Sequence, residues 1–256
     1  MRKASIFVIL SFLSVTILHA EIVPVKKSTT LEAYLFTEFS YPIKRPPQPL
    51  LSQILSNKDY ELFELALKKA DDFKWERVNG IKSNINDDLA KEVIDWIRYY
   101  NGASDLNFAN YRNYIKSNQH WPEIDQIHLR AESKISFRDD YNEIINFFIE
   151  NEPRSGWGKI YLGNALLNSG KNLEGSKLIK EGYINGQFSR SEQSQIIKNF
   201  KSIISQDDHK KRIDSLLWDG KYRTAGRLIK YVNKDYQRLY EARIGLISFA
   251  GGVDEL

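Results

Sequence analysis

The hydrophobic and polar positions of this chain repeat with the period of an α-helix from Leu51 onward. Apolar residues recur at i, i+3, i+4 and i+7, which places them on one face of a helix. The clearest sets are Leu89, Val93, Ile94 and Ile97; Tyr141, Ile144, Ile145 and Phe148; and Ala225, Leu228, Ile229 and Val232. We find no convincing period-two alternation of the kind that a half-buried strand shows. The pattern therefore predicts an all-α fold.

Start and stop signals agree with these helices. Ser189 and Glu192 have the spacing of a capping box, and Asp139 or Asp140 is a suitable N-cap before Tyr141. Glycine favours helix ends because it adopts a positive φ without strain. Three glycines lie where helices are expected to stop: Gly170, Gly182 and Gly220.

An internal repeat appears at an offset of 50 residues, where Leu166–Lys180 aligns with Leu216–Lys230 at seven identical positions of fifteen. Each copy predicts a helix end, a Gly-Lys turn and a second helix with small residues, Gly175 in one copy and Ala225 in the other. A weaker echo spans 67–78. Stacked pairs of this kind predict an α-solenoid of antiparallel, TPR-like hairpins. A chance similarity between two amphipathic helices is the alternative.

The first 50 residues have a different character. Residues 1–20 combine Arg2 and Lys3, an uncharged apolar stretch and a small residue at Ala20, which predicts a cleaved secretory signal peptide. A membrane anchor is the alternative, but the stretch is shorter than the roughly 20 apolar residues that span a bilayer. Residues 21–50 contain a proline cluster and predict an extended arm. Residues 51–256 form the predicted helical domain.

Composition narrows the classes of function. The 256 residues contain no cysteine, which excludes disulfides, zinc-thiolate sites, a cysteine nucleophile and a lipoprotein anchor. Five tryptophans could stack on sugar rings, but we expect Trp96 and Trp218 to fill gaps between helices instead.

Several motifs resemble the helical N-terminal domain of soluble lytic murein transglycosylases. The segment 207–220 is the most informative, and 93–98 resembles the family's helix with a central tryptophan and arginine. Segment 118–123 resembles its Asn-x-x-Trp-Pro turn. Weaker similarities lie at Trp75–Val78, 129–133, Phe147–Gly158, 242–246 and 252–254. Together they cover roughly residues 51–256.

The resemblance implies a periplasmic, exported, superhelical scaffold of an enzyme that cleaves peptidoglycan glycan strands to 1,6-anhydro-muropeptides. In this family a catalytic glutamate precedes a serine and, later, a Gly-Leu-Met-Gln-Leu-Met-Pro run; no such run occurs here, and the only methionine is Met1. We therefore expect the chain to be a fragment that ends before the catalytic domain, is inactive by itself, and has no catalytic, cofactor-binding or metal-binding residue. Peptidoglycan is its expected partner, through the full-length enzyme. Its oligomeric state stays open.

The alternative is a free-standing periplasmic adaptor that binds a protein partner. A terminal repeat normally has a polar outer face, whereas the last predicted helix, Tyr240–Phe249, is apolar. That favours the fragment.

Residues that could suggest chemistry have simpler explanations. Glu132 precedes Ser133, but we expect it to pair with an arginine such as Arg130. Adjacent carboxylates point about 100° apart on a helix and do not converge, so we interpret four Asp pairs as helix caps: Asp71–Asp72, Asp87–Asp88, Asp139–Asp140 and Asp207–Asp208. His120 and His128 are eight residues apart, which is not a metal-ligand spacing. We expect His128 to be partly buried and His209 to belong to a helix start.

Charge offers one functional hint. Residues 209–243 contain ten Lys or Arg and four Asp or Glu, an excess of six positive charges. Such a surface could attract the acidic peptide stems of peptidoglycan, although a solvated polar face is the simpler interpretation. A nucleic-acid partner and a stable membrane anchor are not expected.

Overall fold

The structure is a computed structural model, and it describes residue 52 and residues 54–248. Every described residue belongs to one compact unit, within Leu50–Leu256. The predicted signal peptide and arm lie outside the described residues, as does the similarity at 252–254. No helix within the described ranges has the length and apolarity needed to cross a bilayer.

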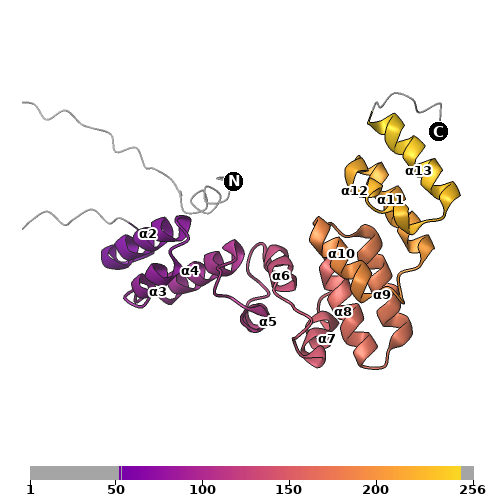
Figure 1. Cartoon of the computed structure of the whole chain (residues 1–256). Helices are drawn as coiled ribbons and strands as arrows, with labels where there is room; N and C mark the ends of the chain where they lie inside the picture. Colours follow the sequence, from indigo (N-terminus) through magenta and orange to yellow (C-terminus); the bar gives the residue numbers. More distant parts are fainter. Residues whose placement is uncertain (1–51, 53, 249–256) are drawn as a thin grey trace, which may run out of the picture. The chain divides into compact units, whose positions relative to one another are not determined.

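All regular secondary structure in residues 54–248 is helical (Figure 1). Helices that follow one another in the chain pack together, so the predicted all-α helical-repeat fold is confirmed. The elements are α2 (Asn57–Asp71), α3 (Trp75–Lys82), α4 (Asp88–Asn101), α5 (Phe108–Ser117), α6 (Ile124–Glu132), α7 (Tyr141–Ile149), α8 (Gly156–Asn168), α9 (Asn172–Asn185), α10 (Arg190–Asn199), α11 (Gln206–Trp218), α12 (Tyr222–Gly226), the 3-10 helix η2 (Ile229–Tyr231) and α13 (Lys234–Ile247).

Most of these helices begin at a side chain that accepts a hydrogen bond from a backbone N–H of the first turn. These N-caps are Ser56, Asp87, Asn107, Asp140, Ser155, Ser189, Ser205 and Asn233. Each bond satisfies one of the N–H groups that a helix start leaves unpaired. The predicted capping box of Ser189 and Glu192 is confirmed. Asp140 rather than Asp139 caps α7.

One turn conformation recurs in the hairpins and explains the internal repeat. Gly170 and Gly220 have φ of +84° and +69°. The next residue then donates its N–H back to the ending helix, Lys171 to the Leu166 carbonyl at 2.9 Å and Lys221 to the Leu216 carbonyl at 2.8 Å. This is a Schellman C-cap, which satisfies carbonyls that the helix end leaves free. Gly170 and Gly220 therefore end helices as predicted.

The weaker echo at 67–78 has the same turn with a different residue at its centre. Lys74 donates its N–H to the Lys69 carbonyl at 3.0 Å, and Phe73 occupies the glycine position with φ of +56°. A left-handed conformation costs a residue with a side chain roughly 1–2 kcal/mol. The Phe73 ring is 67% exposed, so burial offsets little of that cost.

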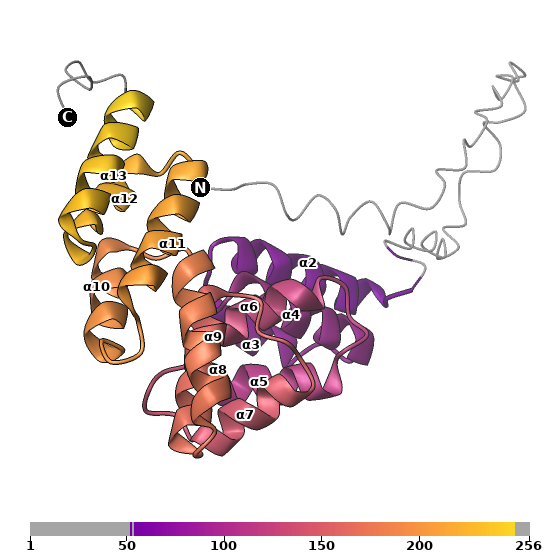
Figure 2. The ribbon, with the colours of Figure 1, turned by 90° about the vertical axis from the view of Figure 1, so that its right-hand side faces the viewer.

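Helices α8 and α9 approach most closely, side by side in Figures 1 and 2, because glycines face backbone across the pair. A methyl group on Gly163 would lie 2.7 Å from the Gly175 carbonyl oxygen, and one on Gly182 would lie 2.6 Å from that of Gly156. The prediction that Gly182 ends a helix is therefore wrong. Gly182 lies within α9 and is buried, and its missing side chain serves this contact.

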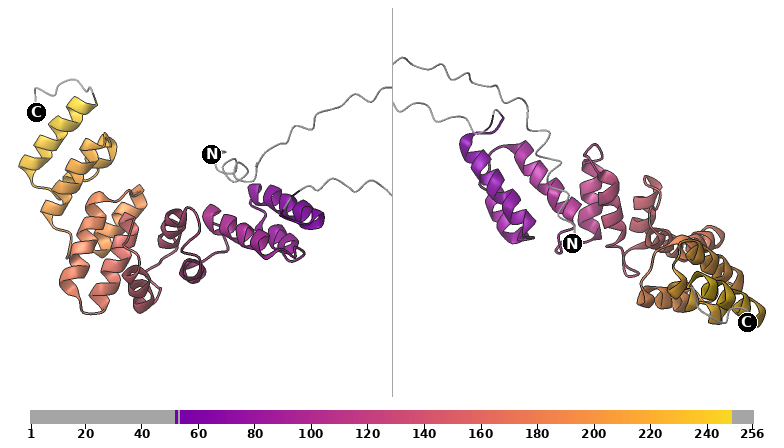
Figure 3. Two further views of the ribbon diagram at one scale, coloured as in Figure 1. Left: turned by 180° about the vertical axis from the view of Figure 1, so that it is seen from behind. Right: turned by 90° about the horizontal axis from the view of Figure 1, so that it is seen from above.

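The second copy of the repeat departs from the predicted single helix. Figure 3 shows α12 as a short helix beside α13. After Gly226 the hydrogen bonds tighten from i−4 to i−3, with Leu228 N–H donating to Ala225 and Tyr231 N–H to Leu228. The prediction of one helix through residues 225–232 is therefore wrong, because α12 ends at Gly226 and the 3-10 helix η2 follows. Ala225, Leu228 and Val232 are nevertheless buried together, against Tyr240 of α13.

Of the two tryptophans expected in the core, one is buried and the other is exposed. Trp96 is buried, and its indole N–H donates to the Pro122 carbonyl at 2.8 Å. Trp218 is 85% exposed, so its predicted packing role is wrong: it is the last residue of α11, next to the turn. Leu89 in the first turn of α4 is also exposed, while Ile94 and Ile97 from the same set are buried.

We predict opposite effects for alanine at two helical glycines. Gly163→Ala should lower the free energy of unfolding by about 2 kcal/mol, because the new methyl group forces α8 and α9 apart. Gly80→Ala in α3 is the control, since nothing lies within 4 Å of its added methyl group. That change should raise the value by about 0.5–1 kcal/mol. Urea unfolding followed by circular dichroism measures both; equal effects would contradict the close-contact explanation.

Phe73→Gly should raise the free energy of unfolding by about 1 kcal/mol, because glycine adopts φ of +56° without the strain that phenylalanine bears. At the equivalent turn, Gly170→Ala should lower it by about 1 kcal/mol for the same reason. The same unfolding measurement applies. A loss of stability in Phe73→Gly would mean that the exposed ring makes contacts worth more than the strain.

Candidate functional site

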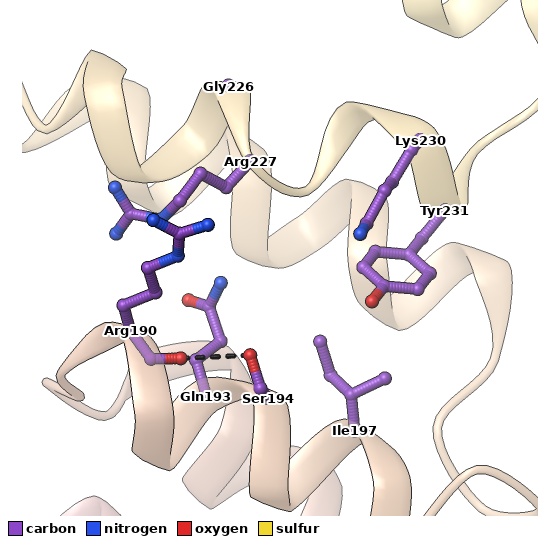
Figure 4. A pocket seen from close by; sticks show the side chains of 8 residues that line it. All are labelled: Arg190, Gln193, Ser194, Ile197, Gly226, Arg227, Lys230 and Tyr231. Carbon is purple, nitrogen blue, oxygen red and sulfur yellow. Dashed lines mark hydrogen bonds between the residues drawn. The ribbon is translucent and has the colours of Figure 1, made fainter.

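A pocket of about 300 Å³ lies between α10 and the α12–η2 segment (Figure 4). Three of its eight lining side chains are cationic, and none is acidic. The lining residues are Arg190, Gln193, Ser194 and Ile197 from α10, and Gly226, Arg227, Lys230 and Tyr231 from the opposite side. We call this the basic pocket.

The three cations of the basic pocket form no ion pair with any described residue, whereas nearby cations do. Lys221 pairs with Asp219 at 3.0 Å, and Arg243 pairs with Asp214. The Arg227 guanidinium instead donates to the Arg223 carbonyl and the Thr224 hydroxyl, both at 3.1 Å, and its Nε is buried without a partner. Unneutralised positive charge around a concave space favours an anionic ligand.

The pocket residue Gln193 is bound by Arg212, which is 1% exposed. Its guanidinium donates to the carbonyls of Tyr183, Ile184 and Gly186 at the C-terminal end of α9, where the helix dipole is negative. It also donates to the Gln193 side-chain oxygen at 3.2–3.3 Å. The Tyr183 and Phe188 rings lie 4.9 and 5.0 Å from its central carbon. Carbonyl dipoles and ring faces thus take the place of a carboxylate partner.

Because an arginine can only donate, Arg212 fixes the amide orientation of Gln193. The oxygen accepts from the guanidinium, and Figure 4 shows the amide nitrogen directed toward the α12–η2 side of the pocket. Gln193 is 5% exposed, and its amide nitrogen forms no hydrogen bond within the described ranges. This nitrogen is a donor that is open to the pocket, so it is a second feature that suits an acceptor ligand.

Tyr231 is held in the pocket wall by a buried histidine. The His209 ring stacks on Tyr231 at 4.8 Å between centroids with 16° between planes, and its Nδ1 lies 2.7 Å from the Tyr183 hydroxyl. Burial lowers the pKa of His209 and raises that of Tyr183. Neutral His209 therefore fills the space beneath the pocket. Its place near the start of α11 was predicted; its burial and contacts were not.

Glu132 has a structural role, but not with the predicted partner. It is 1% exposed, and its carboxylate accepts from the backbone N–H groups of Arg154 and Ser155, at 2.7 and 2.8 Å, and from the Ser155 hydroxyl. It thereby supports the N-cap of α8. Arg130 instead donates to the Tyr100 carbonyl at 3.2 Å, so the expected pair is absent from the described contacts.

The aspartate pairs lie at helix ends, as predicted, and three of the four pairs lie at helix starts. Asp87 and Asp140 are N-caps, and Asp208 completes the capping box of α11. Asp71 and Asp72 instead lie at the C-terminal end of α2 and cap no helix start. Asp87, Asp140 and Asp208 thus accept hydrogen bonds at the starts of three different helices.

The histidines behave as structural residues. His128 is more completely buried than expected and packs near the Phe147 ring at 5.7 Å, while His120 is exposed. Within the part of the chain that the structure describes, no group of three or more His, Cys, Asp and Glu could hold a metal ion.

Sequence reasoning identified only half of the basic pocket. Arg227 and Lys230 belong to the positively charged region 209–243, but Arg190 and Gln193 come from α10 and were not singled out. The internal repeat could have drawn attention to Arg227 and Lys230, because basic residues, Lys177 and Lys180, occupy the same two positions in its first copy. Lys180 lies 3.5 Å from Asp208, whereas Lys230 has no such partner.

Stability should fall as the pH is lowered below about 6.5, the ordinary histidine pKa. The lowered pKa of His209 means that the folded state binds fewer protons than the unfolded state in this range. His209→Gln should make that acid-side slope shallower. Tyr183→Phe is the control, because it removes the hydrogen bond and leaves His209 buried, so the slope should remain. Urea unfolding between pH 5 and 8 provides the measurement; an unchanged slope in His209→Gln would contradict it.

No protein-family model, curated protein or solved structure matches this chain. The fold and the basic pocket must therefore be interpreted from their own residues. Those residues describe an all-α helical-repeat protein with an unneutralised cationic pocket between two of its helical segments.

Proposed function

We propose that this chain is the non-catalytic, N-terminal scaffold of a periplasmic lytic murein transglycosylase. Such enzymes cleave peptidoglycan glycan strands to 1,6-anhydro-muropeptides. In this proposal the chain reaches the periplasm through residues 1–20, and peptidoglycan is the partner of the whole enzyme.

One observation carries the proposal: motifs that resemble this family contact one another across helices that are not adjacent in the chain. Trp96 of the 93–98 motif donates to Pro122 of the Trp-Pro turn and stacks near Trp121 at 6.2 Å between centroids. Glu132 of the 129–133 motif accepts hydrogen bonds from Ser155, the N-cap of the helix that carries Gly158. Motif residues that join helices support a role as a framework.

The use of Glu132 in a cap also supports a scaffold without its own chemistry. A catalytic glutamate has to reach substrate and exchange a proton with it. The Glu132 carboxylate is buried and accepts hydrogen bonds from Arg154 and Ser155. Substrate could reach it only after the start of α8 had come apart.

A free-standing helical-repeat adaptor is the second candidate. Its support is a set of exposed apolar side chains near the end of the described chain: Trp218, Leu239, Leu246 and Ile247. Exposed apolar groups of this size suit a protein interface.

The purified chain should bind murein sacculi without releasing anhydro-muropeptides. Co-sedimentation measures the binding, and chromatography of the supernatant measures release. Release would overturn the non-catalytic assignment. Failure to co-sediment would favour the adaptor.

Glu132→Gln should lower the free energy of unfolding by about 1–3 kcal/mol, because an amide cannot accept all the hydrogen bonds that the carboxylate accepts. Glu150→Gln is the matched control at an exposed position and should change the value by less than about 0.5 kcal/mol. Denaturant unfolding of both variants tests the structural role. A stable Glu132→Gln variant would contradict it.

A further inference from the structure

We propose that the basic pocket binds a short acidic peptide that carries two carboxylate groups. This inference does not depend on the cell-wall assignment, because it rests on the pocket between α10 and α12–η2 alone. Its starting point is the absence of any ion pair between Arg190, Arg227 or Lys230 and another described residue. Positive charge gathered in this way attracts an anionic ligand.

The positive charge in the pocket is divided between two places. Figure 4 shows the guanidinium groups of Arg190 and Arg227 near each other at one end, one from each wall. At the other end the Lys230 ammonium lies over the Tyr231 ring, 5.1 Å from its centroid. Two guanidinium forks suit one carboxylate, and an ammonium with a phenol suits another. The ligand that matches both ends has two anionic groups.

Groups between these ends suit a peptide rather than a lone inorganic anion. The Gln193 amide nitrogen is a free donor in the middle of the pocket, suited to a peptide carbonyl. Ile197 and the Tyr231 ring provide apolar wall between the polar groups. The volume of about 300 Å³ lies at the lower end of small-molecule sites, and a single phosphate would leave one end unused.

The pocket is also held in place before any ligand arrives. Arg212 orients Gln193, His209 stacks on Tyr231, and Arg227 is tied to Arg223 and Thr224. Side chains already fixed by other contacts lose less conformational entropy when a ligand binds. Side chains held in place by other residues are expected in a binding site, whereas a solvated polar face does not need them.

The test is calorimetric titration of the full chain with the dipeptide alanyl-glutamate, which carries two carboxylates. We expect saturable binding that weakens as salt is added, since exposed charges are screened. Alanyl-glutamine amide, without either carboxylate, should bind at least about tenfold more weakly, as should inorganic phosphate. Equal binding of alanyl-glutamine amide or of phosphate, or no saturable binding of alanyl-glutamate, would overturn the proposal.

Variants then locate the site. Arg227→Gln and Lys230→Gln should each weaken alanyl-glutamate binding by about tenfold. Lys211→Gln removes the same charge from an exposed position outside the pocket and should change affinity less than about twofold. Circular dichroism confirms folding of each variant. If Lys211→Gln weakened binding as much as Arg227→Gln does, the effect would come from net charge alone, and the assignment to this pocket would be overturned.

A measurement on the unaltered chain avoids the question of variant folding. In nitrogen-15 spectra the side-chain amide signals of Gln193 should shift as alanyl-glutamate is added, because its free NH₂ group gains an acceptor. Side-chain amides outside the pocket serve as internal references. Binding that leaves the Gln193 signals unmoved would place the peptide elsewhere.

Discussion

A buried guanidinium without a carboxylate partner is the contact on which the C-terminal half of the described structure depends. Arg212 of α11 neutralises the carbonyl end of α9 and binds Gln193 of α10, so one side chain joins three helices. A charge in this environment is tolerable only while its hydrogen bonds are complete. That requirement keeps α9, α10 and α11 in one arrangement. The basic pocket inherits its geometry from that arrangement.

The internal repeat shows how one local sequence pattern leads to two different structures. Both copies share the turn at Gly170 or Gly220, because its hydrogen bonds are local. After the turn, α9 continues past Gly182 because glycines let it lie against α8. The second copy ends its helix at Gly226 and tightens into η2, which keeps Leu228 and Val232 buried. The break places Arg227, Lys230 and Tyr231 around a pocket instead of along a regular helix.

Acidic residues that could suggest catalysis serve as hydrogen-bond acceptors at helix starts. Helix starts need acceptors, and short polar side chains provide them at little entropic cost. Asp87, Asp140 and Asp208 act in this way at their own helices, and Glu132 does so from another helix. Arg190, Arg227 and Lys230 have no acidic partner among the described residues, unlike Lys221 and Arg243.

Local chemistry by itself determined the helical class, the cap at Ser189 and the turns at Gly170 and Gly220. Each of these depends on residues within one or two turns of each other, and the sequence displays that spacing directly. Tertiary packing alone decided that Gly182 stays inside a helix, that Trp218 is exposed and that Glu132 accepts hydrogen bonds from Ser155, the N-cap of α8. It also brought Arg190 to Arg227 across two helical segments. Contacts between residues far apart in the chain follow from how whole faces fit together, and no periodicity within one segment encodes that fit.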